Sequence, residues 1–151
     1  MKQALDLAIE NYKRLRDEAA AELQQAQQHL SAMRNTLQTL DDYRAEQRQR
    51  RRLSADSSRR VAALRMDTHF AGTIEQAIEQ QRLYVQQAID RVEQRRMDLL
   101  GKQKKLKAVE MIVHQRAQRA AAWAKRQERL ATDELAAIRH LQRIQASDSD
   151  S

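Results

Sequence analysis

A single periodic segment dominates the sequence; it runs from Ile74 to Ile144 and reads IEQAIEQQRLYVQQAIDRVEQRRMDLLGKQKKLKAVEMIVHQRAQRAAAWAKRQERLATDELAAIRHLQRI. Alternating steps of four and three residues from Ile74 visit twenty-one positions, and fifteen of them are apolar. This repeat of 3.5 residues, with no proline and one interior glycine, Gly101, is typical of a long coiled-coil helix. At ~1.5 Å per residue the helix is roughly 105 Å long, so another helix must cover its apolar stripe.

The N-terminal third carries an apolar stripe of its own. Its members are spaced three or four residues apart: Leu5, Ala8, Tyr12, Leu15, Ala19, Leu23, Ala26, Leu30, Met33, Leu37 and Leu40. This spacing predicts a first helix over about residues 2–52 with one continuous apolar face. Two long helices joined by a short reversal pack as an antiparallel hairpin. We therefore expect an all-α protein, a two-helix antiparallel coiled-coil hairpin in which the second helix is longer and overhangs the first.

The boundaries follow from local composition, with residues 1–146 expected to form a single hairpin. Serine and aspartate favour turns over helix interiors, so the sequence LSADSS predicts the reversal at residues 53–58. A second possible break lies at residues 68–72, because Thr73 and Gln76 have the spacing of a capping box. The second helix is expected to end near residue 146, and the tail 147–151, SDSDS, to be disordered.

The unequal helix lengths leave part of the second helix without a partner. At least ~20 of its residues, roughly 30 Å, extend past the start of the first helix. Leu130, Leu141 and Ile144 lie in this extension, and no segment of the chain is left to cover them. An exposed apolar stripe indicates insertion into a partner. A frayed, alanine-rich end is the alternative.

Composition argues against an enzyme. Of 151 residues, 32% are charged and only five are aromatic, so an enclosed catalytic pocket is not expected. The chain lacks cysteine, and its four histidines, His29, His69, His114 and His140, have no ligand-spaced neighbours, which argues against a metal site. We expect no cofactor. The longest apolar run, residues 120–124, is far shorter than the ~20 residues that span a bilayer, so a soluble cytoplasmic protein is expected.

Positive charge is concentrated on the second helix. The formal net charge is +7, and residues 91–129 hold twelve basic and four acidic side chains. Such a field attracts nucleic acid, anionic lipid or acidic protein. The lysines at 102, 104, 105 and 107 spread around the helix, and no aromatic stacking platform lies near them, which disfavours nucleic acid. Docking to an acidic protein surface is the more economical interpretation, and a basic RNA-binding hairpin remains an alternative.

A mixed aromatic and apolar group gathers where the chain reverses. A hairpin brings the end of the first helix and the start of the second together, and with them a set defined here as the six-residue patch: Leu40, Tyr43, Phe70, Ile74, Ala77 and Gln81. Tyrosine and phenylalanine are favoured in protein interfaces, so the patch is a candidate partner-binding site, although Ile74 also suits the closing of the hairpin. Nearby, Glu75, Glu79 and Arg82 have the spacing of a solvated ion-pair ladder.

The chain also resembles a known family in several ordered motifs. These are Leu40-Asp41-Asp42-Tyr43-Arg44, Phe70 ahead of Ile74-Glu75-Gln76-Ala77-Ile78-Glu79-Gln80-Gln81-Arg82, and Lys102-Gln103-Lys104-Lys105-Leu106-Lys107 followed by Glu110 and Arg116. Together they resemble the flagellar export protein FliJ family, cytoplasmic two-helix hairpins similar to the central stalk of rotary ATPases. The AIEQQ block is the most specific of the motifs.

The resemblance implies a non-catalytic stalk and chaperone-like component of flagellar type III protein export. Its implied partners are the export ATPase ring, the membrane export gate and export chaperones, at the inner face of the cell membrane. It also implies that the six-residue patch contacts the gate. Gln47 stands where the family can carry an aromatic residue, and Gln81 where it can carry histidine. The stalk protein of virulence type III secretion has the same shape and is the related alternative.

Overall fold

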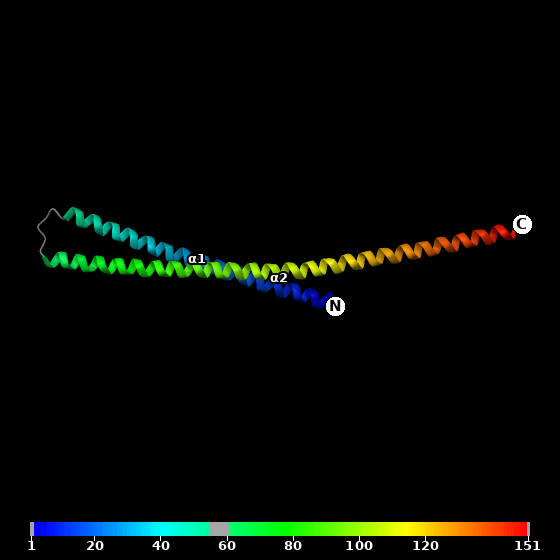
Figure 1. Cartoon of the computed structure of the whole chain (residues 1–151), viewed down its shortest axis with the longest axis horizontal. Helices are drawn as coiled ribbons and strands as arrows, with labels where there is room; N and C mark the ends of the chain where they lie inside the picture. The colour runs from blue at the N-terminus through cyan, green and yellow to red at the C-terminus, as the bar shows by residue number, and fades with distance from the viewer. Residues whose placement is uncertain (1, 55–60, 151) are drawn as a thin grey trace. The chain divides into compact units, whose positions relative to one another are not determined.

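Two long helices make up the part of the chain that the structure describes. The computed structural model describes residues 2–54 and 61–150 (Figure 1). Helix α1 spans Lys2–Ser54 and helix α2 spans Val61–Ser149, 53 and 89 residues respectively. Within these ranges every residue except Asp150 is helical and no strand occurs. The predicted all-α hairpin with a longer second helix is confirmed.

The chain divides into two compact units, each containing part of both helices. The hairpin unit is Asn11–Lys104, and the terminal unit combines Met1–Glu10 with Lys105–Ser151. Within the described residues, neither helix contains a segment long and apolar enough to cross a membrane.

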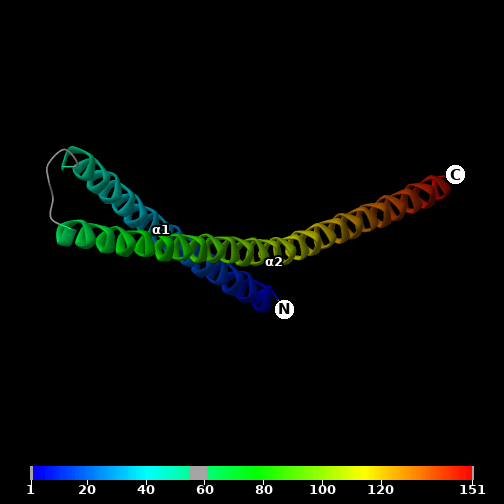
Figure 2. The same ribbon diagram turned by 60° about the vertical axis from the view of Figure 1, so that its left-hand side comes forward.

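In the hairpin unit the two helices run antiparallel, as the views of Figures 1 and 2 show. Three contacts between the helices establish the direction: Arg95 to Glu22 at 2.8 Å, Gln81 to Met33 at 2.9 Å, and Arg44 to Glu75 at 3.2 Å. In these pairs, residues with higher numbers on α1 contact residues with lower numbers on α2. The register therefore brings the end of α1 level with the first turns of α2.

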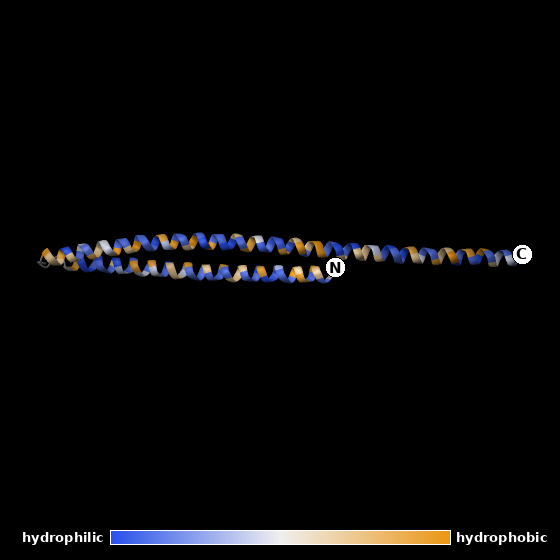
Figure 3. Cartoon of the chain, turned by 90° about the horizontal axis from the view of Figure 1, so that it is seen from below, coloured by the Kyte–Doolittle hydropathy of each residue, from blue (hydrophilic) through white to orange (hydrophobic). Residues whose placement is uncertain are grey.

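The core of the hairpin unit is a thin seam along the predicted stripes. Its buried apolar residues are Ala19 and Ala26 on α1, and Ile74, Ile78, Ala88 and Val92 on α2. Both buried residues of α1 are alanines, whose small side chains let two helices approach closely. Ile78 is completely buried. Because only one helix covers each stripe, most other seam leucines stay half-buried, and Figure 3 shows hydrophobic and hydrophilic residues alternating along both helices.

The seam on α2 changes character after Val113. Every seam position from Ile74 to Val113 is buried or half-buried, including Leu106 in the terminal unit. From His114 to Asp150 every residue is exposed, although the 3.5-residue spacing continues to Ile144. The prediction that the end of the second helix lacks a covering segment is thus confirmed for the described residues.

The predicted boundaries need three corrections. Helix α1 still includes Leu53 and Ser54, and the rest of the predicted reversal, residues 55–58, lies outside the described residues. The possible break at residues 68–72 is wrong, because α2 runs through it. Thr73 does not cap a helix; its hydroxyl donates to the His69 carbonyl at 3.1 Å, as it does inside a helix. The tail is helical as far as Ser149, whose hydroxyl donates to the Ala146 carbonyl at 3.0 Å.

Gly101 offers a direct test of the helical packing. Neither its backbone nor its surroundings require glycine, because its φ is not positive and a Cβ built on it meets nothing within 4 Å. Gly101→Ala is expected to raise the free energy of unfolding by roughly 0.5–1 kcal/mol, since glycine loses more backbone entropy in a helix. Thermal unfolding followed by circular dichroism measures the gain. A lower melting temperature would show that Gly101 has a packing role that the structure lacks.

Candidate partner-binding site

An aromatic pair joins the two helices near the turn end of the hairpin unit. The rings of Tyr43 on α1 and Phe70 on α2 lie edge to face, with centroids 6.0 Å apart and planes at 76°. This geometry is worth about 0.5–1.5 kcal/mol beyond the area that it buries. Tyr43 is nevertheless 39% exposed and Phe70 44% exposed. The pair therefore presents two ordered aromatic rings to solvent.

The rest of the six-residue patch is less accessible. Ile74 is buried, and Leu40 and Ala77 are half-buried. The structure thus brings the patch to one part of the hairpin unit, but Ile74 serves the seam, as its position in the sequence also suggested. A partner approaching this region would touch mainly Tyr43 and Phe70.

Gln81 lies inside the seam and holds the register of the two helices. It is 8% exposed, and its side-chain amide donates to the Met33 carbonyl at 2.9 Å and reaches the Met33 sulfur at 3.5 Å. A buried amide needs such partners, because leaving it unsatisfied costs about 1–3 kcal/mol. A slip of α1 along α2 would remove them. The structure therefore gives Gln81 a role inside the hairpin, and its contact with a partner stays a prediction.

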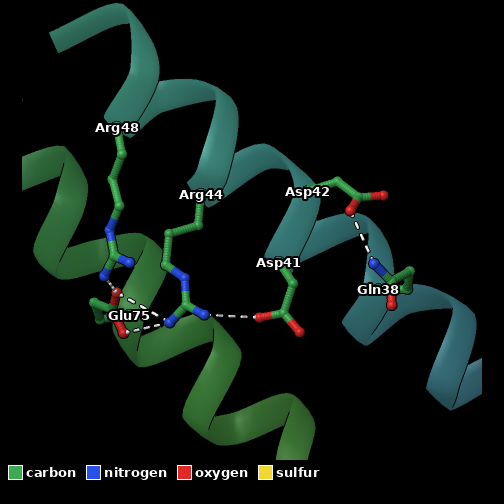
Figure 4. Close-up of polar contacts among 6 residues, drawn as sticks. All are labelled: Gln38, Asp41, Asp42, Arg44, Arg48 and Glu75. Carbon is green, nitrogen blue, oxygen red and sulfur yellow. Dashed lines mark hydrogen bonds and ion pairs between the residues drawn. The ribbon is translucent and has the colours of Figure 1, made fainter. Parts of the chain in front are cut away.

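A polar cluster lies across the helix interface, close in sequence to the aromatic pair, and Figure 4 shows its members. The Glu75 carboxylate accepts from Arg44 at 3.2 Å and 3.3 Å and from Arg48 at 3.2 Å. Arg44 also donates to Asp41 at 3.2 Å. Glu75 thus binds α1, which corrects the ion-pair ladder expected with Glu79 and Arg82. The sequence analysis did not predict this cluster. Its signal in the sequence is the spacing of Arg44 and Arg48, which are one helical turn apart and so lie on the same face of α1.

Neighbouring carboxylates in this region point apart. Asp41 turns to Arg44, whereas Asp42 accepts from the side chain of Gln38 at 2.8 Å (Figure 4). Among the described residues no group of three or more histidine, aspartate or glutamate side chains could hold a metal ion.

A second candidate surface lies on the exposed part of α2 in the terminal unit. Trp123 is 64% exposed, and Leu130, Leu141 and Ile144 are also exposed. These four residues are separated by seven, eleven and three positions, so a helix places them on one side. An apolar stripe of this kind without cover marks an interaction site. We refer to these four residues as the C-terminal stripe.

A comparison with protein-family models identifies the family of the chain. The family model of the flagellar FliJ protein matches residues 1–145. The chain belongs to the flagellar FliJ protein family. The resemblance seen in the sequence motifs is thereby confirmed, and the chain is a component of flagellar type III protein export in a family whose members are non-catalytic. No curated protein and no solved structure matches the chain.

Proposed function

We propose that this FliJ-family chain is a stalk and chaperone-like rod that links the export ATPase ring to the membrane export gate. The observation that carries the proposal is the C-terminal stripe, an apolar surface that continues the hairpin seam without a covering helix among the described residues. A helix of a partner protein can pack against a seam with this spacing. The export ATPase ring is the partner that we assign to it.

Charge supports a protein partner for this part of α2. Residues 114–149 carry seven basic and four acidic side chains, and none of them is buried. A ring opening lined with acidic side chains would complement the basic surplus and speed association. The apolar stripe would supply the affinity for the ring, and the charges around the stripe would orient the helix as it binds.

We assign binding of the export gate to Tyr43 and Phe70. Aromatic rings that are already ordered lose little conformational entropy on binding, which favours them as interface anchors. The hairpin would then contact the gate at the turn end and the ATPase through α2. Export chaperones are further proposed partners, and the site of action is the inner face of the cell membrane, reached through these proteins.

Coupling would arise from differential contact. A rod that binds the ATPase ring more tightly in some nucleotide states than in others shifts the population of those states. By linkage, a change at the ATPase surface can then alter the position of the rod at the gate. The chain itself needs no catalytic group for this role.

The proposal is tested with the intact chain and the export ATPase. We expect the chain to co-purify with the ATPase and to change its rate of ATP hydrolysis. A scaffold without this role would do neither. An RNA-binding hairpin would instead bind RNA with an affinity that falls steeply with salt concentration, and that result without ATPase binding would contradict the proposal.

A further inference from the structure

The helix ends at the turn of the hairpin unit carry a basic and apolar surface that the proposed ATPase and gate contacts do not use. The described residues 48–54 and 61–66 contain five arginines and no acidic residue. Arg52 and Arg65 are exposed and make no ion pair with any described residue. Two cations of this segment are thus free to meet a negatively charged surface.

Large apolar side chains stand beside these arginines and are exposed to water. Leu53 is 75% exposed and Met66 74% exposed, and Val61 and Leu64 are also exposed. Figure 3 shows hydrophobic residues among hydrophilic ones at this end of the hairpin unit. Together with Arg52 and Arg65, these four apolar residues define the turn-end surface. Exposed side chains of this size gain free energy when they leave water.

The directions of the apolar side chains indicate what kind of surface they meet. At about 100° per residue, Leu64 and Met66 lie roughly 300° and 140° around α2 from Val61. A protein docking on one side of the helix would leave at least one of them in water. A lipid layer that receives the helix ends end-on would contact all of them, while the arginines reach the phosphates.

We propose that the turn-end surface binds directly to a membrane rich in anionic phospholipids. The arginines supply electrostatic attraction and the apolar side chains insert between the headgroups. This binding needs neither the ATPase nor the gate, so it goes beyond the function proposed above and succeeds or fails independently of it. An acidic protein segment is the competing occupant, which the test distinguishes.

The test measures partition of the intact chain onto vesicles. We expect binding to vesicles that contain phosphatidylglycerol and little binding to pure phosphatidylcholine. Each lipid-contacting arginine contributes about fivefold to partition, so Arg52→Gln with Arg65→Gln should weaken it about 25-fold. Leu53→Gln with Met66→Gln should weaken it roughly tenfold or more. All four side chains are exposed, so helix content should not change.

Two controls report on the other basic part of the chain. Arg139→Gln with Arg143→Gln removes the same charge from the terminal unit and should leave partition within about twofold. Trp123, the single tryptophan, lies in that unit and should keep its emission wavelength on binding. A blue shift, or an equal loss for both arginine pairs, would mean general attraction of a basic chain and would overturn the proposal.

The remaining outcome concerns the competing occupant. If the chain fails to bind anionic vesicles but binds polyglutamate in a manner that needs Arg52 and Arg65, the turn-end surface recognises acidic protein. Failure to bind either probe would also overturn the proposal. Binding to anionic vesicles that is lost in the turn-end variants supports it.

Discussion

Replacing Tyr43 and Phe70 together by alanine is expected to abolish binding to the export gate and swimming motility while the helices stay intact. Buried aromatic anchors each contribute about 2 kcal/mol or more to an interface, so the pair should weaken gate binding at least a hundredfold. Both rings are partly exposed in the free chain. Their loss should therefore cost the hairpin about 0.5–1.5 kcal/mol for the ring contact plus the free energy of the area that the two rings bury, less than the loss of two fully buried rings.

A matched control is available on the same unit. Leu83 and Tyr84 are exposed to a similar or greater degree than the aromatic pair, and Leu83→Ala with Tyr84→Ala removes a comparable apolar area. This variant should bind the gate and support motility normally. Circular dichroism distinguishes a binding role of Tyr43 and Phe70 from a core role. A large loss of helix content in the Tyr43→Ala/Phe70→Ala variant would show that the two residues belong to the core.

Introducing aspartate into the C-terminal stripe is expected to have the largest effect on ATPase binding. Leu130→Asp with Leu141→Asp would place charges in an interface that we propose to be apolar. An unpaired buried charge costs several kcal/mol, so binding should fall roughly a thousandfold. Both leucines are exposed in the free chain, so its melting temperature should change little.

Leu135 provides the control for this change. It is exposed like Leu130, but five residues along a helix place it about 140° around the axis, off the stripe. Leu135→Asp should therefore leave ATPase binding nearly intact. Equal losses for Leu130→Asp and Leu135→Asp would indicate that charge on the helix matters and not a specific apolar face.

The sequence predicted the helices and the seam but not the contacts that set their register. The apolar spacing identifies Ala19, Ala26 and Ile78 as seam positions, and all three are buried. A 3.5-residue repeat looks the same after a slip of one heptad, however, so it cannot choose a register. The contacts of Gln81 with Met33 and of Arg95 with Glu22 select one, and both require knowledge of which residues lie opposite each other.

The break predicted at residues 68–72 is absent for a physical reason. Thr73 and Gln76 have the spacing of a capping box, and that signal suggested a break before Thr73. Burial of Ile74 and Ile78 against α1 outweighs this preference, so α2 continues, and the Thr73 hydroxyl bonds to the preceding turn instead of capping a new helix. The sequence predicted the six residues of the patch as one group. It could not predict that Tyr43 and Phe70 are exposed whereas Ile74 and Gln81 are buried, because this depends on how the side chains pack between the helices.

We infer that one chain carries separate surfaces for the ATPase and for the gate. The most direct measurement is ATPase binding by the Leu130→Asp/Leu141→Asp variant beside the Tyr43→Ala/Phe70→Ala variant. Our account predicts that the first variant loses the ATPase and that the second retains it. Retention of the ATPase by the first variant, or its loss by the second, would contradict the account.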